Sequence, residues 1–311
     1  MKKKSSRMPD GVLLVDKPAG LTSFDVVKIV KKMVHPMKIG HTGTLDPMAT
    51  GLLPLTLGQA TKLTRFLTDQ TKRYLASLQL GTATDTLDVE GKVVAEFEVP
   101  DLTEDKIRAG LSAFEGEIQQ IPPMYSALHH QGKRMYQLAR QGLEVERKPR
   151  RVTIDRIELT DFGPDQIELD ICCSAGTYIR SLAADLAEKL GTCGHLIGLR
   201  RIETDGWHVD QALQIEKLCK EDLAAAIIPI EKVLERYLKI NVSQEIARRL
   251  EQGQLLGQDE LNDMIPMQIQ ADTVVWFCSP DATVIVLANI ISSPDQKISG
   301  MKFLRMLKIS H

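Results

Sequence analysis

The segment from Gln166 to Gly191, QIELDICCSAGTYIRSLAADLAEKLG, places a strand pattern directly before a helix pattern. Its first eight residues alternate apolar and polar side chains with a period of two, which is typical of a half-buried strand. That alternation directs Cys173 into a core and leaves Cys172 on the other face. Leucines then recur at helical spacing until Gly191, a residue that suits the end of a helix. The chain therefore contains a sheet with a helix packed on it.

The same two patterns recur along the chain at irregular intervals. GVLLVDKPAG, from Gly11, indicates a short buried strand closed by a Pro/Gly turn. TSFDVVKIVKKMV follows as an amphipathic helix with Thr22 or Ser23 as its N-cap. YLASLQLG, from Tyr74, indicates another strand. Because strands and helices interleave irregularly, an α+β fold with a mixed sheet is favoured over a regular βαβ succession.

The length and a change in composition predict two domains. A chain of 311 residues is longer than most single cores. After about Leu238 the sequence changes to short apolar strands, TVVWFC and ATVIVLANI, separated by polar turns. We therefore expect a large domain at residues 1–237 and a small β-rich domain at 238–311.

Composition removes several classes of protein. The five cysteines form no CxxC pair and are odd in number, which argues against a disulfide framework and a zinc ribbon. Cys193 and His195 alone, without a second ligand pair, favour core packing over a metal site. The apolar run 12–15 is too short for a signal peptide, and no later segment reaches a membrane-spanning length. We expect a cytoplasmic protein with no membrane partner.

The net charge of −2 hides an uneven distribution. Residues 1–65 carry a net charge of +7 and residues 133–151 a net charge of +5, so the remaining residues carry −14. Two basic segments on an acidic body suit a phosphate backbone. Solvated surface helices rich in lysine explain these charges equally well.

The second basic segment, PPMYSALHHQGKRMYQLARQGLEVERKPRR, combines cationic with aromatic and imidazole side chains. Such a combination is typical of a mobile element that grips RNA. A surface helix that follows the double proline is the alternative. The side chains that motivate the RNA-gripping hypothesis are Tyr125, His129, His130 and Tyr136.

The stretch from Gly40 to Pro54, GHTGTLDPMATGLLP, contains one carboxylate, Asp46. A glycosidase built on two carboxylates or a metal site needs more acidic residues than this. No GKS or GKT follows its glycines, so a phosphate-binding P-loop is weakly supported. An aspartate that begins a turn before proline is the structural alternative, and spacing alone does not exclude it.

These segments together resemble the TruB-type tRNA pseudouridine synthases. GVLLVDKPAGLTS, GHTGTLDPMATGLLPL, KRYLASLQLGTATDTLDVEG, PPMYSALHHQGKRMYQLARQG and AGTYIRSLAADLAEKLG occur in the family's order, between about residues 10 and 207. The resemblance implies isomerisation of uridine to pseudouridine at position 55 in the T-arm loop of tRNA, without cofactor or metal. It also implies a cleft across the mixed sheet, an inserted RNA-gripping thumb at about 123–151 and a C-terminal PUA-like RNA-binding domain.

The resemblance assigns catalytic roles to three residues. Asp46 matches the family's nucleophile, and attack on C1′ of the ribose, addition to C6 of the base and elimination to a glycal all remain open. Tyr74 matches the tyrosine that stacks against the target base and is implicated in removing the C5 proton. Arg180 matches the arginine that pairs with the nucleophile, and we expect Asp88 to hold Arg180 from its other side.

Further residues match positions around the family's active site. His41 matches the histidine that fills the gap left when the target base flips out of the loop. Lys17, Tyr178 and Leu199 match positions near the active site, with expected roles in RNA binding or in shaping the pocket.

Two other functions compete with this interpretation. A noncatalytic RNA-binding or tRNA-folding protein needs only the basic segments and the β-rich tail. A guide-RNA-dependent synthase of the archaeal and eukaryotic kind lacks the thumb segment. We therefore expect a stand-alone, monomeric enzyme that acts on the T-arm stem-loop of tRNA and needs neither guide RNA nor a protein partner.

Overall fold

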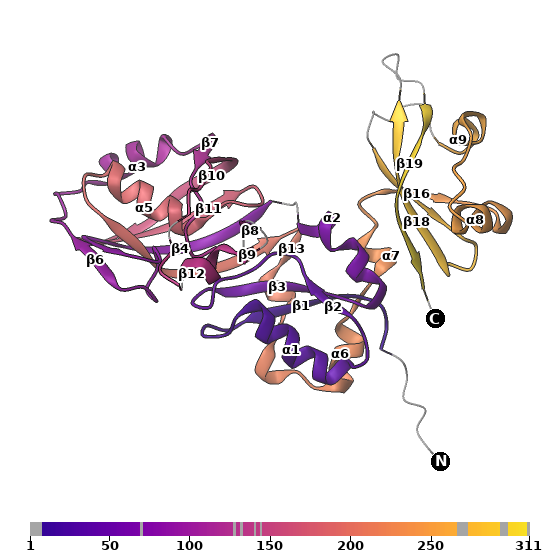
Figure 1. Ribbon diagram of the computed structural model, residues 1–311, viewed down its shortest axis with the longest axis horizontal. Coiled ribbons are helices and arrows are strands. Elements are labelled where there is room, and N and C mark those ends of the chain that lie inside the picture. The colour runs from indigo at the N-terminus through magenta and orange to yellow at the C-terminus, as the bar shows by residue number, and fades with distance from the viewer. Residues whose placement is uncertain are drawn as a thin grey trace.

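The chain forms a large mixed sheet over most of its length and a smaller sheet at its C-terminal end, which lie apart in Figure 1. Both belong to a computed structural model. The residues that this structure describes are 8–68, 71–126, 129–130, 133–139, 141–143, 145–265, 273–292 and 298–309.

The large sheet follows the order β14–β1–β3–β12–β4–β11–β10–β7. Strand β12 pairs parallel with β3 and antiparallel with β4, so the sheet is mixed. The predicted α+β class with a mixed central sheet is thereby confirmed. These strands, with those that pair beside them, are β1 (Gly11–Lys17), β2 (Ile39–His41), β3 (Thr50–Leu57), β4 (Lys72–Leu80), β7 (Gly116–Gln120), β10 (Arg150–Phe162), β11 (Gln166–Cys173), β12 (Gly194–Thr204), β13 (Trp207–His208), β14 (Leu213–Gln214) and β15 (Ile228–Pro229).

Alternate residues of β1 enter different cores, because successive side chains of a strand point to opposite faces. Leu13 and Val15 belong to the main core, into which four helices pack. Val12 and Leu14 belong to a second core on the opposite face. The helices that pack into the main core are α1 (Ser23–Val34), α3 (Glu104–Ser112), α5 (Ile179–Lys189) and α6 (Lys220–Ala226).

The local predictions for these elements are confirmed. Thr22 caps α1, with its hydroxyl accepting from the Asp25 backbone N–H at 3.1 Å while the Asp25 carboxylate accepts from the Thr22 N–H at 3.2 Å. Cys173 is fully buried and Cys172 is half-buried. Gly191 follows α5 with a φ of +87°, a left-handed conformation that favours glycine.

The C-terminal part has its own sheet in the order β16–β17–β18–β19, as predicted from its short apolar strands. It fits the PUA-like domain that the resemblance implies. Strand β16 begins at Leu238; the domain boundary between residues 237 and 238 stays a prediction. The elements are β16 (Leu238–Asn241), β17 (Val274–Cys278), β18 (Val284–Ser292), β19 (Ile298–Lys308), α8 (Gln244–Glu251) and α9 (Gln258–Met264).

The two sheets share an apolar contact. Trp276 and Leu307 of the small sheet belong to the same buried cluster as Val12 and Leu14 of β1. The Trp276 indole also donates to the Tyr237 carbonyl at 3.1 Å. The shared core therefore joins the small sheet to the domain that contains the large one.

The described residues of the predicted thumb segment, 123–151, form two short strands, a five-residue helix and the first two residues of β10. The side chains of His129, His130 and Tyr136 lie outside the described residues, so the RNA-gripping role stays a prediction. The remaining short elements of the chain are β5 (Thr82–Thr84), β6 (Val93–Glu96), β8 (His129–His130), β9 (Lys133–Arg134), α2 (Thr64–Thr68), α4 (Met135–Ala139), α7 (Ile230–Val233) and the 3₁₀ turns η1 (Gly58–Leu63), η2 (Val209–Gln211) and η3 (Ile215–Lys217).

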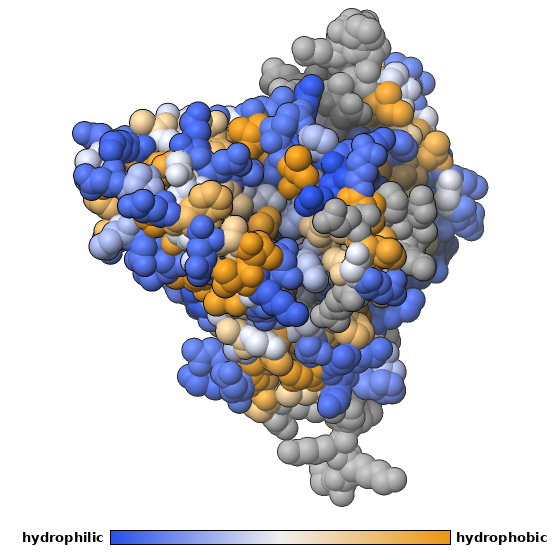
Figure 2. Space-filling model, turned by 60° about the vertical axis from the view of Figure 1, so that its left-hand side comes forward, coloured by the Kyte–Doolittle hydropathy of each residue, from blue (hydrophilic) through white to orange (hydrophobic). Residues whose placement is uncertain are grey.

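On the face shown in Figure 2, hydrophobic side chains form separate groups among hydrophilic ones. Within the described part of the chain, every helix is too short or too polar to cross a membrane.

Candidate active site

Asp46 lies in the loop between β2 and β3, at the head of a turn. Its carbonyl accepts from the Ala49 N–H at 3.1 Å, so the aspartate does begin a turn, as the structural alternative expects. The neighbouring Leu45 is tied to α1, because its N–H donates to the Ser23 hydroxyl at 2.8 Å. The loop is thus fixed to a helix on one side of the acid.

Lys17 supports this loop from behind. Its side chain is fully buried, and its ammonium donates to the carbonyls of Pro18, Leu21 and Pro47 at 2.8, 2.6 and 3.1 Å. Burial lowers the pKa of Lys17 to about 8, although the Asp46 carboxylate opposes this shift. In this structure Lys17 therefore contacts the backbone beside Asp46 rather than an open surface.

Arg180, in the first turn of α5, lies between two carboxylates. Its Nη2 donates to Asp46 Oδ1 at 3.1 Å, and its Nε lies 3.0 Å from Oδ2, as an ion-pair contact outside hydrogen-bond geometry. Its Nη1 lies 3.2 Å from Asp88 Oδ2. The carbonyls of Thr86 and Tyr125 accept its remaining hydrogen bonds at 2.9 and 2.7 Å. The planar guanidinium is thus fixed on every side, as the fork geometry allows.

Asp88 is itself fixed and buried. Its Oδ1 accepts from the Thr86 hydroxyl at 2.6 Å and from the Glu90 N–H at 3.1 Å, and the residue is 3% exposed. The side chain of Asp46 is 32% exposed and that of Arg180 only 4%. The network therefore presents one accessible carboxylate, Asp46, on a buried support.

Burial raises the pKa of the Asp46 carboxyl above its ordinary value. The Arg180 guanidinium opposes the rise, and the negative charge of Asp88 adds to it. Burial likewise raises the pKa of the nearby Glu90 carboxyl, to which Asp88 and Asp46 contribute. The local acids thus disfavour one another's ionisation, and Arg180, with a smaller contribution from Lys17, compensates them.

Asp46 and Arg180 line two cavities. The smaller, of about 240 Å³, also contains three of the predicted residues: Tyr74, Tyr178 and Leu199. The larger, of about 570 Å³, contains the predicted His41 and Asp88. The structure thus gathers every predicted residue except Lys17 around one ion pair, with Lys17 directly behind it.

Tyr74 comes from β4 and is 7% exposed. Burial raises the pKa of its phenol, while Arg201, which hydrogen bonds to the phenol, opposes that rise. Arg201 is 1% exposed and donates to the carbonyls of Leu52 and Gly43 at 2.7 and 3.2 Å. It therefore connects the tyrosine to both β3 and the loop that bears Asp46.

Sequence reasoning did not identify Arg201. A signal was present, because Leu199 and Arg201 occupy alternate positions of β12 and both line the smaller cavity. A cation at an inward position of a strand is unusual unless it has partners. Gly51, paired opposite it, makes room: a Cβ there would lie 2.3 Å from the Arg201 carbonyl oxygen.

Tyr178 is the N-cap residue of α5 and helps to place Arg180. Its N–H donates to Gln120 Oε1 at 2.7 Å, and its carbonyl accepts from Gln120 Nε2 at 3.0 Å. Burial raises the pKa of the Tyr178 phenol. The strand that carries Gln120 thus fixes the start of the arginine helix.

The possible ligands Cys193 and His195 do not form a metal centre with other residues in the described ranges. His195 is 7% exposed, and its Nδ1 lies 2.7 Å from the carbonyl oxygen of Thr82.

Solved structures share this fold. A chain of a Cbf5–Nop10–Gar1 complex has a TM-score of 0.73 and 25% identity, and the match covers 97% of this chain and 85% of that one. A chain of an H/ACA RNP bound to a substrate RNA containing 2′-deoxyuridine has a TM-score of 0.70 and 24% identity, over 97% and 86% of the two chains. The second likeness establishes the fold alone.

Sequence comparisons identify the family. The N-terminal domain of the TruB family of pseudouridylate synthases matches residues 31–179. The tRNA pseudouridine synthase B of Clostridium tetani is 43% identical over 256 residues, which are 82% of this chain and 89% of that protein. Proteins of the same name from Clostridium perfringens and Coxiella burnetii are 45% and 44% identical, over 78% and 80% of this chain and 83% and 82% of their own lengths. The chain is therefore an isomerase that belongs to the TruB family of pseudouridylate synthases.

Proposed function

We propose that this enzyme converts uridine to pseudouridine at position 55 in the T-arm loop of tRNA, with Asp46 as its nucleophile. The names of the relatives support tRNA as the substrate. The observation that carries the role of Asp46 is its ion pair with Arg180 at the wall common to both cavities. One accessible carboxylate held by a buried cation is suited to nucleophilic catalysis.

The proposed reaction breaks the N1–C1′ bond of uridine and forms a C5–C1′ bond. The base loses the proton on C5 and gains one on N1, so the reaction needs no oxidant, reductant or second substrate. A single carboxylate suffices, because it can attack once and leave once. Attack at C1′, addition at C6 and formation of a glycal each fit this balance.

Arg180 and Asp88 act through Asp46. Arg180 orients the carboxylate by two contacts and stabilises its charged form, while Asp88 holds the opposite edge of the guanidinium. A carboxylate placed in this way needs no reorganisation when the base arrives.

Tyr74 lines the smaller cavity together with Asp46. It is the proposed stacking partner of the target base and the proposed acceptor of its C5 proton. Arg201 positions the Tyr74 phenol and favours its ionised form, against the effect of burial. Leu199 and Tyr178 supply further walls of the pocket for the base.

The target base has to leave its stack to reach Asp46. His41 lines the larger cavity beside Asp46, and we assign to it the filling of the gap that the base leaves. Lys17 keeps the Asp46 loop in place through three carbonyl contacts.

We also assign the reaction to a single chain without guide RNA. Arg180 contacts Asp46 and Asp88, Arg201 contacts Tyr74, and all five residues come from this chain. The competing function, RNA binding without catalysis, leaves the Asp46–Arg180 pair without a purpose.

The test is to incubate the purified protein with a T-arm stem-loop RNA and to map pseudouridine by carbodiimide-dependent stops of reverse transcription. We expect a stop at the target uridine with the wild-type enzyme and no stop with Asp46→Asn. An RNA with cytidine at that position is the matched control. No stop with the wild-type enzyme would refute the T-arm assignment.

A further inference from the structure

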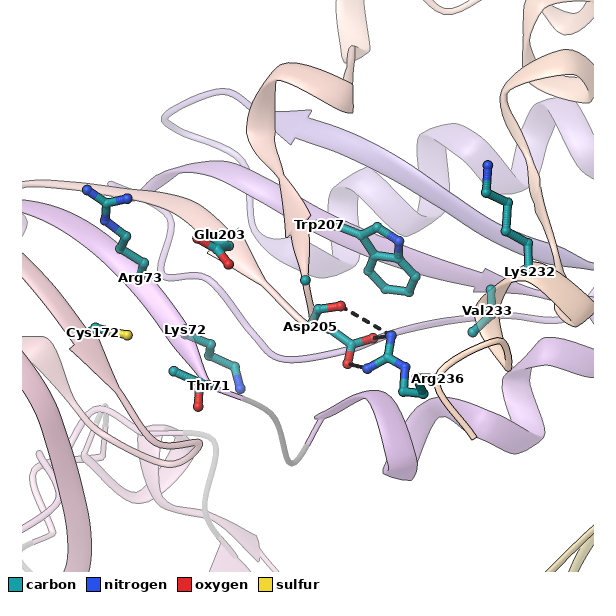
Figure 3. Close-up of a pocket in the computed structure, with 11 residues that line it drawn as sticks. Thr71, Lys72, Arg73, Cys172, Glu203, Asp205, Trp207, Lys232, Val233 and Arg236 are labelled. Atoms are coloured by element: carbon teal, nitrogen blue, oxygen red, sulfur yellow. Dashed lines mark hydrogen bonds and ion pairs between the residues drawn. The ribbon is translucent and has the colours of Figure 1, made fainter. Parts of the chain in front are cut away.

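A third cavity, of about 460 Å³, lies beside the active site toward the C-terminal sheet. Figure 3 shows Lys72, Arg73 and Cys172 on one side of it and Asp205, Trp207 and Arg236 on the other. Lys72 also lines the smaller active-site cavity. The two cavities therefore adjoin at the start of β4.

Three cations of this cavity differ in whether they have an ion-pair partner. Arg73 is paired with Asp170 and Arg236 with Asp205, so these two arginines are fixed. Lys232, in contrast, has no ion-pair partner among the described residues, although it lines the cavity. A free ammonium in a cavity that adjoins an RNA-modifying site is available for a phosphate group.

Trp207 gives the cavity an aromatic wall. It is half-buried, and the Arg236 guanidinium lies 5.8 Å from the centre of its ring. The same guanidinium is held in place by a bidentate contact with the Asp205 carboxylate, whose side chain is fully buried. The indole is thus fixed beside a rigid cation, an arrangement on which nucleobases stack.

We propose that this cavity is a second nucleotide subsite, which binds a nucleotide of the substrate RNA other than the one that is isomerised. The base stacks on Trp207, and a phosphate contacts Lys232. The volume lies within the range of pockets that enclose small ligands. The carboxylate of Glu203, which has no ion-pair partner among the described residues, also lines the cavity; it accepts a hydrogen bond from an N–H group of the base and disfavours a ligand that is purely anionic. This inference rests on the proposed function in so far as the ligand is RNA.

The position of the subsite gives it a purpose. The chain passes from Arg236 directly into the C-terminal sheet, which begins at Leu238. RNA that occupied both the Asp46 cavity and this one would extend from the catalytic sheet toward the small sheet. The subsite thereby sets the direction of the RNA on the protein.

The first test measures RNA affinity with variants of Trp207 and Lys232. Trp207→Leu keeps apolar bulk but removes the stacking face, and we expect it to raise the Kd for a T-arm stem-loop about tenfold. Trp207→Phe should recover most of that loss. Lys232→Gln should weaken binding and lower the salt slope by about 0.7, whereas Lys232→Arg should not. Lys189→Gln, at the exposed end of α5, is the matched control.

A merely structural role of Trp207 would give a different pattern. The single-turnover rate at saturating RNA should stay within about twofold of wild type in Trp207→Leu, because the subsite binds and does not react. The loss of affinity should also disappear with RNAs shortened until they no longer reach the cavity. An equal loss for every length of RNA would overturn the proposal.

Cys172 provides an independent probe, because its half-buried thiol lines the cavity. We expect bound RNA to slow alkylation of Cys172 at least fivefold while the exposed Cys219 reacts unchanged. Burial raises the pKa of the Cys172 thiol, so the reaction is best followed at alkaline pH. The affinity and alkylation measurements use the intact chain with Asp46→Asn, which prevents turnover, whereas the single-turnover rates are measured without that substitution.

The outcomes separate the subsite from the proposed function. If the wild-type enzyme modifies the stem-loop, yet Trp207→Leu and Lys232→Gln bind every RNA with wild-type Kd and Cys172 is not protected, the subsite is refuted. If Cys172 is protected and Trp207→Leu weakens binding, but no pseudouridine forms, the subsite stands and the T-arm assignment falls.

Discussion

The two walls of the smaller cavity each contain a buried arginine, but the arginines have opposite kinds of partner. Arg180 lies between the carboxylates of Asp46 and Asp88. Arg201 contacts backbone carbonyls and the neutral phenol of Tyr74, and no carboxylate pairs with it among the described residues. One wall is therefore acidic and the other basic.

The comparison shows that arginine performs two different tasks in this cavity. On the acidic wall the planar fork of Arg180 sets the position of a carboxylate, so geometry is what the arginine supplies. On the basic wall Arg201 places an uncompensated charge beside a phenol, so its charge acts on proton affinity. A substitution that keeps the charge but changes the shape of the side chain should therefore lower the reaction rate more at Arg180 than at Arg201.

Asp46→Asn should produce the largest effect, because the amide retains the shape but has no nucleophilic charge. We expect the single-turnover rate to fall by about 10⁴-fold or more, while the Kd for RNA stays within a few-fold of wild type. Asp105→Asn, an exposed acid on α3, is the control and should react normally. Near-normal turnover of Asp46→Asn would remove the assignment of the nucleophile.

Arg180→Lys should come next, because it keeps the charge and loses the fork. A displacement of the nucleophile by about 1 Å costs on the order of a hundredfold in rate. We expect that loss in the single-turnover rate, with little change in Kd. Arg108→Lys, an exposed arginine paired with Glu104, serves as control. A wild-type rate for Arg180→Lys would show that charge alone suffices on the acidic wall.

Arg201→Lys should cost less, about tenfold, because a lysine retains the charge beside Tyr74. Arg201→Met should cost more, since loss of the cation lets burial raise the pKa of the Tyr74 phenol further. If Tyr74 accepts the C5 proton, RNA with 5-deuterouridine should show a larger isotope effect in Arg201→Met than in wild type. An unchanged isotope effect would contradict the link between the two residues. So would a double variant in which Arg201→Met lowers the rate of Tyr74→Phe by as large a factor as it lowers the rate of the wild-type enzyme.

Much of the fold followed from local patterns. The period-two strands at Tyr74 and Gln166 and the capped helix at Thr22 needed only neighbouring residues, and all three are confirmed. The order of the strands did not follow, because β12 pairs with both β3 and β4 across long stretches of chain. Such pairings depend on tertiary packing, which local periodicity does not encode.

The acidic wall was easier to anticipate than the basic one. Asp46, Asp88 and Arg180 stand in segments that resemble the family, and their opposite charges suggested a network. The partners of Arg201 are mostly backbone carbonyls, which every residue possesses and which therefore leave no signal in the sequence. The sequence therefore offers for Arg201 only its alternation with Leu199 in β12, and its partners become visible only once the chain is folded.

Asp88→Asn should have the smallest effect on rate, about fivefold, because Arg180 keeps its contacts with Asp46 and two carbonyls. It should also shift the pH dependence. The negative charge of Asp88 raises the pKa of Asp46, so its removal lowers that pKa. Because the nucleophile acts as a carboxylate, the acidic limb of the single-turnover rate should move to lower pH.

The double variant Arg180→Lys with Asp88→Asn tests whether these residues form one network. Once Arg180 is a lysine, Asp88 no longer holds a planar fork, so its removal should add little further loss. We therefore expect a combined loss smaller than the product of the two single losses. Rates of the four proteins on one stem-loop RNA, measured across pH, decide the point. Independent effects would show that Asp88 does not act on Asp46 through Arg180, and an acidic limb that moves to higher pH in Asp88→Asn would contradict the direct effect of the Asp88 charge on the pKa of Asp46.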